Sequence, residues 1–223
     1  MTPDRLVIFD VDGTLVDSQE HIVAAMSAAF DTISLTLPTR QEVLSIVGLS
    51  LGEAIARLLP DAAPSVRDVA VQAYKQAFGH LRAGTLSPLY PGAAAALDGL
   101  HARDGFQLGI ATGKSRRGLA HILEAHGLER HFATCQVADD HPSKPHPSML
   151  LAALAETGVE PARAVMLGDT TYDIEMARAA GVAAIGVSWG YHRPEALAGA
   201  GATQVIDRFD DLEAALVRIW GAA

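Results

Sequence analysis

Carboxylate, hydroxyl and lysine side chains follow several apolar runs of this 223-residue chain. The first run ends in Asp10-Val-Asp12-Gly-Thr, and a later one ends in Gly168-Asp-Thr-Thr-Tyr-Asp173. Another run ends at Thr112, and Lys144 lies in a loop after a weaker run. Crowded carboxylates repel one another unless a cation lies among them, and a hard cation with oxygen ligands is typically Mg²⁺. The pattern therefore predicts a magnesium site that holds one phosphoryl group with help from the lysine and the threonine.

The same residues suggest a reaction. A carboxylate is a credible nucleophile at neutral pH, because it needs no deprotonation and its acyl phosphate is labile to water. Asp10 is best placed for attack, since it stands at the tip of the first run. Asp12 points the same way if the extended chain continues, so it is predicted to protonate the leaving alcohol and later deprotonate the hydrolytic water. Taken singly, Asp169 and Asp173 are equally typical of helix caps.

The stretch Gly109-Ile-Ala-Thr-Gly-Lys-Ser115 ends like a nucleotide-binding P-loop. Such a loop needs its first glycine six residues before the lysine, but Leu108 occupies that place. We interpret the stretch instead as the exit of a strand, where Thr112 meets the phosphoryl group. Lys114 then becomes a bystander or a charge at the mouth of the site, so Thr112→Ala is predicted to impair turnover far more than Lys114→Ala.

Short apolar runs alternate with helical segments rich in alanine and leucine, which predicts an α/β fold with a doubly wound, Rossmann-like parallel sheet. The carboxyl ends of parallel strands meet at one edge, so the polar residues that follow the runs are expected to share a crevice. The predicted strands cover residues 5–9, 106–112, 134–138, 163–169, 182–189 and 202–206, and the predicted helices cover 92–104, 116–127, 146–158, 171–181 and 209–220.

One long stretch interrupts this alternation. Helix-start signals at Thr39 to Glu42, Ser50 to Glu53 and Ser65 to Asp68 predict an inserted four-helix cap subdomain without strands. We therefore expect a core domain made of residues 1–15 and 86–223, and a helical cap subdomain over 16–85.

The composition limits the kinds of partner and the cellular compartment that we expect for this protein. The formal net charge is −9, and lysine occurs only at positions 75, 114 and 144, so a nucleic-acid surface is not expected. No apolar run approaches the roughly 18 residues of a membrane span, and the first residues lack the pattern of a secretory signal. Cys135 is the single cysteine, which excludes a disulfide framework. These features predict a cytoplasmic protein; they do not indicate an oligomeric state.

The motifs DVDGTLVDS, Thr112, Lys144-Pro145 and GDTTYD, in this order, resemble the haloacid dehalogenase-like superfamily of phosphohydrolases. The insertion and Tyr90-Pro-Gly92 are similar to the phosphoglycolate phosphatase branch. The resemblance implies that Asp10 is the nucleophile and Asp12 the acid and base. It implies that Thr112, the Gly113 amide and Lys144 bind the phosphoryl group, with Gly13 also at the substrate phosphate. It further implies Mg²⁺ bound by Asp10, the backbone carbonyl of Asp12, and Asp169, with Asp173 in support of the metal waters.

The resemblance implies a small phosphate ester as the substrate, with 2-phosphoglycolate as the leading candidate. Pyrophosphate, sugar phosphates, nucleoside monophosphates, a sugar-phosphate mutase reaction and a non-enzymatic phosphate- or partner-binding protein stay open. Residues 48–51 resemble the family's specificity loop. We interpret His21 and Lys75 as surface residues, and His141 and His146 as part of a polar loop. Tyr191, His192 and Arg193 are candidates to line the entrance and to contact a distal carboxylate or phosphate of the substrate.

Overall fold

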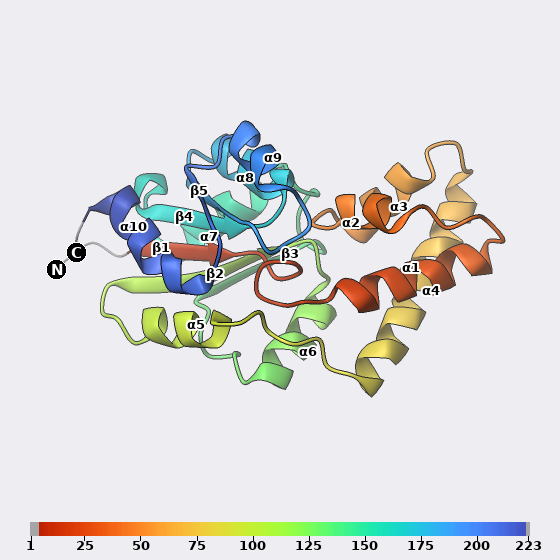
Figure 1. Ribbon diagram of the computed structural model, residues 1–223, viewed down its shortest axis with the longest axis horizontal. Coiled ribbons are helices and arrows are strands. Elements are labelled where there is room, and N and C mark those ends of the chain that lie inside the picture. The colour runs from red at the N-terminus through yellow and green to blue at the C-terminus, as the bar shows by residue number, and fades with distance from the viewer. Residues whose placement is uncertain (1–4, 222–223) are drawn as a thin grey trace.

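The computed structural model describes residues 5–221, and its centre is one parallel six-stranded sheet (Figure 1). The strands are β1 (Arg5–Phe9), β2 (Phe106–Thr112), β3 (Thr134–Val137), β4 (Ala164–Gly168), β5 (Ala183–Val187) and β6 (Gln204–Ile206). Their spatial order is β3-β2-β1-β4-β5-β6, with every neighbouring pair parallel. The order reverses between β1 and β4, which confirms the predicted doubly wound sheet and places its switch point there.

Helices cover both faces of the sheet, because alternate side chains of its central strands are apolar on both sides. In β1, Val7 and Phe9 enter one hydrophobic cluster while Leu6 and Ile8 enter the other. The first cluster is completed by α5 (Ala93–His101), α6 (Arg116–His126) and α10 (Leu212–Trp220). The second is completed by α7 (Ser148–Thr157), α8 (Thr171–Ala179) and α9 (Pro194–Ala200).

The helix α9 is absent from the predicted elements. It has only seven residues, and one of them, Gly199, is a glycine with little helical preference. Pro194 occupies its first turn, where the missing amide costs no hydrogen bond. The last predicted helix, from residue 209, begins as a 3₁₀ turn, η2 (Phe209–Asp211), before α10; a further 3₁₀ turn, η1 (Pro161–Arg163), precedes β4.

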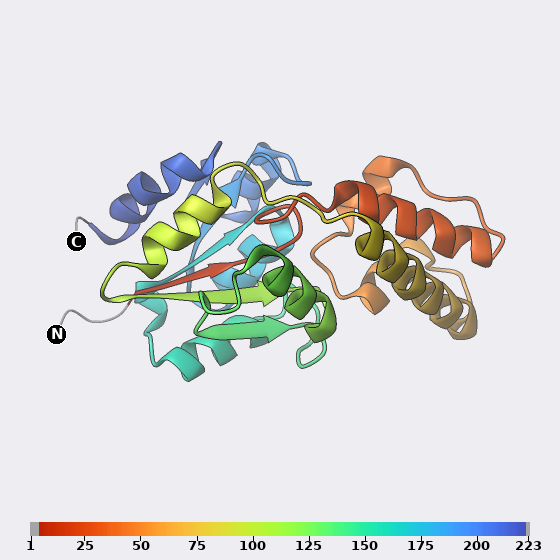
Figure 2. The same cartoon turned by 90° about the horizontal axis from the view of Figure 1, so that it is seen from below.

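Five helices lie between β1 and β2, and the first four form the predicted insertion, which we call the helical cap: α1 (Gln19–Thr32), α2 (Arg40–Ser45), α3 (Leu51–Leu58) and α4 (Pro64–Gly84). The cap has its own hydrophobic cluster, in which Met26 and Phe30 of α1 meet Ile55 of α3 and Ala70 of α4. Figure 2 shows the cap beyond the carboxyl ends of the strands. No helix within residues 5–221 combines the length and apolar character needed to span a bilayer.

The three predicted helix starts in the cap have different outcomes. Thr39 and Glu42 form the predicted capping box at the start of α2. Ser50 precedes α3, although its side chain makes no capping hydrogen bond. The prediction for Ser65 was wrong, because α4 already begins at Pro64, whose ring presets the backbone angle of a first helical residue.

Candidate active site

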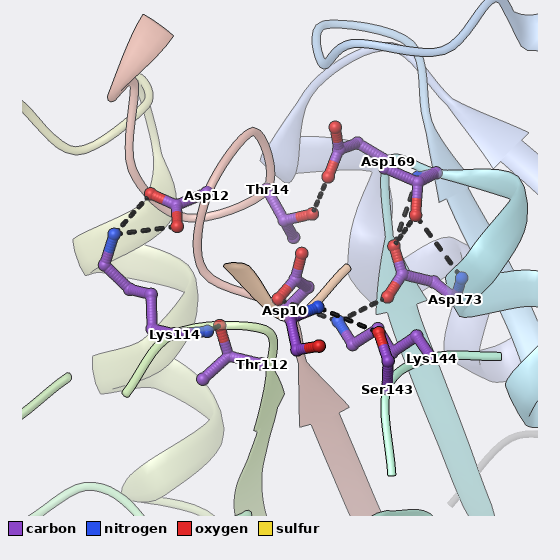
Figure 3. A network of polar contacts seen from close by, with 11 residues as sticks. Asp10, Asp12, Thr14, Thr112, Lys114, Ser143, Lys144, Asp169 and Asp173 are labelled. Atoms are coloured by element: carbon purple, nitrogen blue, oxygen red, sulfur yellow. Dashed lines mark hydrogen bonds and ion pairs between the residues drawn. The ribbon is translucent and has the colours of Figure 1, made fainter. Parts of the chain in front are cut away.

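The carboxyl ends of the central strands bring the predicted residues together at the switch point of the sheet (Figure 3). Asp10 follows β1, Thr112 ends β2 and Asp169 follows β4. Lys144 reaches the same place from the loop before α7, and Asp173 does so from the first turn of α8. All five side chains are buried, so the cluster is part of the interior at the edge of the sheet.

Lys144 is the cation at the centre of this cluster. Its Nζ lies 2.9 Å from Oδ1 of Asp10 and donates a hydrogen bond of 2.7 Å to Oδ1 of Asp173. Burial by itself lowers the pKa of Lys144, but the carboxylates of Asp10 and Asp173 outweigh it and hold that pKa above its ordinary value. Lys144 therefore stays protonated and links the end of β1 to the first turn of α8.

Three carboxylates at this place are suited to a metal ion. Asp10, Asp169 and Asp173 each offer an oxygen within 4.8 Å of the others. Among the residues that the structure describes, none donates a directed hydrogen bond to Asp10, whose contact with Lys144 is an ion pair. Burial raises the pKa of Asp10 from 3.8 to about 7, and burial with the neighbouring carboxylates raises the pKa of Asp169. A hard divalent cation would offset this crowding of charge, so the donor set fits one.

Asp169 is held from both sides. Its Oδ1 accepts a hydrogen bond of 2.9 Å from Thr14, and its Oδ2 accepts one of 2.9 Å from the amide of Tyr191. Two glycines make room for it: a Cβ on Gly13, where φ is +83°, or on Gly190 would lie 2.3 Å or 2.1 Å from its side chain. The structure thus gives Gly13 a packing role against Asp169; its predicted contact with substrate phosphate stays a prediction.

Asp173 performs two tasks at once. Its Oδ2 accepts hydrogen bonds from the hydroxyl and the amide of Thr170, which completes a capping box at the start of α8. Its Oδ1 accepts the hydrogen bond from Lys144. The helix-cap interpretation of this residue is confirmed, while its support of the metal waters stays a prediction.

The carboxylate of Asp12 forms an ion pair with Lys114 and not with Lys144. Both of its carboxylate oxygens lie 2.7 Å from Nζ of Lys114, and Oδ1 also accepts a hydrogen bond from Ser18. Figure 3 shows Asp12 pointing to Lys114 on the side away from Lys144. Lys114 is not a bystander: it lines the cavity, as the alternative interpretation of a charge at the mouth of the site predicted, and it pairs with Asp12. The loop after β1 turns at Gly13 beside this contact.

The cap closes over the end of β2 through residues 46–50. A Cβ on Gly113 would lie 2.5 Å from the carbonyl oxygen of Leu49 and 2.7 Å from that of Gly48. The amide of Ser50 donates a hydrogen bond of 2.8 Å to Oγ of Ser143, beside Lys144. The loop that resembles the specificity loop thus rests on the core, and a cavity of about 850 Å³ between cap and core reaches Asp10, Asp12 and Thr112.

Other residues considered from the sequence lie outside the carboxylate cluster. His21 pairs with Ser87 at 2.8 Å, and His141 lies 2.8 Å from both Gln136 and Ser148. His146 accepts a hydrogen bond from the amide of Ser148, His192 accepts one from the amide of Thr171, and Arg193 precedes α9. Lys75 is exposed and lines the cavity. The amide of Tyr191 is a support for Asp169 that the sequence interpretation missed, since a backbone donor leaves no signal in residue type.

Comparison with known proteins assigns the family. The haloacid dehalogenase-like hydrolase family matches residues 7–187, which is most of the chain. The chain belongs to this family. Pyrophosphatase PpaX of Bacillus pumilus is 35% identical to this hydrolase over 192 residues, with 86% of each chain covered. A phosphoglycolate phosphatase of Salmonella paratyphi A is 30% identical over 235 residues, covering 95% of this chain and 92% of the relative.

A solved structure supports the same assignment. CbbY of Rhodobacter sphaeroides, in complex with xylulose-(1,5)bisphosphate, has a TM-score of 0.80 and 29% identity to this hydrolase. The match covers 94% of this chain and 96% of CbbY. Together with the named phosphatases among its relatives, the family assignment makes this hydrolase a phosphatase.

The close contact at Gly113 makes a testable prediction. Gly113→Ala is expected to push residues 48–49 away from the core and lower kcat/KM by about 10²-fold, because ångström-scale misplacement at a site has that effect. Gly99→Ala in α5 is the control, since no atom lies within 4 Å of its added Cβ. A Gly113→Ala variant with the steady-state kinetics of Gly99→Ala would show that the cap does not need this contact.

Proposed function

We propose that this hydrolase is a Mg²⁺-dependent phosphomonoesterase that cleaves a small phosphorylated metabolite through an aspartyl-phosphate on Asp10. One observation carries the proposal. The carboxylate of Asp10 is buried at the switch point and borders the cavity. Apart from the ion pair of its Oδ1 with Lys144, its oxygens have no hydrogen-bond partner among residues 5–221. A lone pair left free at the floor of a cavity is what an attacking carboxylate requires.

The proposed reaction has two displacements at phosphorus. In the first, Oδ of Asp10 forms a bond to phosphorus as the bond to the ester oxygen breaks, and Asp12 gives that oxygen its proton. In the second, Asp12 takes a proton from water, whose oxygen attacks phosphorus and releases phosphate from Asp10. Lys144, the hydroxyl of Thr112 and the amide of Gly113 would hold the phosphoryl oxygens. Lys114 would orient Asp12 through its contact with both carboxylate oxygens.

The carboxylates of Asp10 and Asp169, with the main-chain carbonyl of Asp12, would hold Mg²⁺, and Asp173 would support them. When bound, the ion supplies positive charge that offsets both the carboxylates and the phosphoryl oxygens. The support is the buried cluster of carboxylates, in which burial and the neighbouring negative charges raise the pKa of Asp10 and of Asp169.

The substrate proposed first is 2-phosphoglycolate, supported by the relative named for that activity. Pyrophosphate is the second candidate, since the relative at 35% identity is named a pyrophosphatase. The test is phosphate release from p-nitrophenyl phosphate, 2-phosphoglycolate and pyrophosphate, each with Mg²⁺ and with a chelator. The proposal expects turnover only with Mg²⁺; turnover that survives chelation, or no turnover of any ester, would contradict it.

Metal binding can also be measured without activity. Saturating Mg²⁺, at about 100 times its Kd, is expected to stabilise the folded protein by about 2.7 kcal/mol and to raise Tm by roughly 5–10 °C. Asp169→Asn should remove most of that shift, because it removes a carboxylate of the cluster. Asp104→Asn, at an exposed position before β2, is the control and should keep it. An equal shift in both variants would place the ion elsewhere.

A further inference from the structure

The wall of the cavity carries three cations that the protein itself does not neutralise. Lys75 and Arg82 of α4 and Arg117 of α6 all line it. Within the part of the chain that the structure describes, none of the three forms an ion pair or a hydrogen bond. In a protein with a net charge of −9, three unpaired cations on one cavity mark a place of positive potential.

The two elements that carry these cations face each other across the cavity. Lys75 and Arg82 are seven residues apart, which is two helical turns, so they lie on the same face of α4. Phe78 and Gly79 lie between them and line the cavity as well, which identifies this face as the one toward the core. Arg117 belongs to the first turn of α6, and Figures 1 and 2 both show α6 beside the C-terminal end of α4.

The cations at the reacting end of the cavity are already engaged. Lys144 is bound by Asp10 and Asp173, and Lys114 is bound by Asp12. Asp139, the other carboxylate on the cavity wall, accepts a hydrogen bond from the amide of Arg116. Lys75, Arg82 and Arg117 therefore retain charge and hydrogen-bond donors for a group that enters from outside.

We propose that Lys75, Arg82 and Arg117 form a subsite for a second anionic group of the substrate, at the end of the molecule away from the reacting phosphate. The inference rests on the proposed phosphomonoesterase function and narrows its substrate class to doubly anionic metabolites. A phosphate or a carboxylate matches the donors, because arginine binds either group through two parallel N–H donors. The cavity of about 850 Å³ has room for both groups on one small molecule.

Substrates of matched length test the subsite. Propyl phosphate, 3-phosphooxypropionate and propane-1,3-diol bisphosphate share a three-carbon chain and differ only in the group at the far end. With Mg²⁺, the wild-type protein is expected to show a kcat/KM at least about 10-fold higher for one or both doubly anionic compounds than for propyl phosphate, as charged hydrogen bonds contribute. The larger of the two preferences identifies the anion as a phosphate or a carboxylate, and higher ionic strength should reduce it.

Variants assign that preference to the three cations. The measured quantity is kcat/KM for a doubly anionic compound divided by kcat/KM for propyl phosphate. Arg82→Gln alone should lower this ratio. The triple variant, which carries Lys75→Gln, Arg82→Gln and Arg117→Gln, should bring it to near one. Arg130→Gln removes an exposed charge that does not line the cavity and should keep the wild-type ratio. Equal values for all three compounds in the wild type, or a ratio that the triple variant leaves unchanged, would overturn the subsite alone. Failure to hydrolyse any of them would overturn the phosphatase mechanism as well.

Discussion

Asp10→Asn is expected to reduce kcat by about 10⁴-fold or more, since loss of a covalent nucleophile has effects of this size in other enzymes. The same change should stabilise the metal-free protein. Asp10 is buried beside two other carboxylates, and burial outweighs its ion pair with Lys144, so its negative charge opposes folding when no metal ion is bound. Steady-state kinetics measures the first effect, and thermal melting with a chelator measures the second, with Tm higher by on the order of 5 °C at pH 8.

The stabilisation should depend on pH in one direction. The pKa of Asp10 is 3.8 in the unfolded chain and about 7 in the folded protein. Between these values the folded state binds the extra proton, so the contribution of Asp10 to the free energy of unfolding falls as pH rises through the window. The advantage of Asp10→Asn should therefore be absent below pH 3.8 and largest above about 7. A variant less stable than the wild type at pH 8 would contradict this account of the site.

Lys144→Met is expected to lower the free energy of unfolding by about 3–5 kcal/mol, because it leaves buried carboxylates without their cation. Nζ of Lys144 lies within 2.9 Å of oxygens of both Asp10 and Asp173, and the side chain is buried. Activity should also fall by about 10²-fold or more, since the phosphoryl group loses a fixed positive charge. Urea denaturation of the metal-free protein measures the stability effect.

Lys75→Met is the matched control for Lys144→Met. It removes the same charge from an exposed position and should change stability by no more than about 0.5 kcal/mol. Addition of Asp10→Asn to Lys144→Met should restore part of the lost stability, which a double-mutant cycle would reveal as coupling. Equal stabilities of Lys144→Met and Lys75→Met would mean that the ion pairs contribute nothing to the fold.

The sheet was predictable because its strands are buried on both faces. RLVIF and FQLGIAT form continuous runs rich in apolar residues, and the structure places β1 and β2 at the predicted residues. Helix starts were less predictable where two signals compete. Pro64 and Ser65 both mark the start of a helix, and the proline takes the first helical position because its backbone angle is preset.

The gathering of Asp10, Thr112, Lys144 and Asp169 was predictable for a topological reason, since each lies at or after the carboxyl end of a strand in a parallel sheet. The partner of Asp12 was not. It depends on a turn at Gly13 that directs the loop after β1 toward Lys114, and spacing along the chain carries no such direction. This contact changes the expected result of mutagenesis. Lys114→Ala should impair turnover as Thr112→Ala does, because each of the two single variants removes a contact within the site.

Trapping the covalent intermediate tests the nucleophile most directly. The protein is mixed with substrate and Mg²⁺, reduced with borohydride during turnover, digested and analysed by peptide mass spectrometry. Borohydride reduces an aspartyl-phosphate to homoserine, so the mechanism predicts homoserine at position 10, dependent on substrate and Mg²⁺ and absent when Asp10 is replaced by Asn. Phosphate release with Asp10 unmodified, or homoserine at position 12 instead, would contradict it.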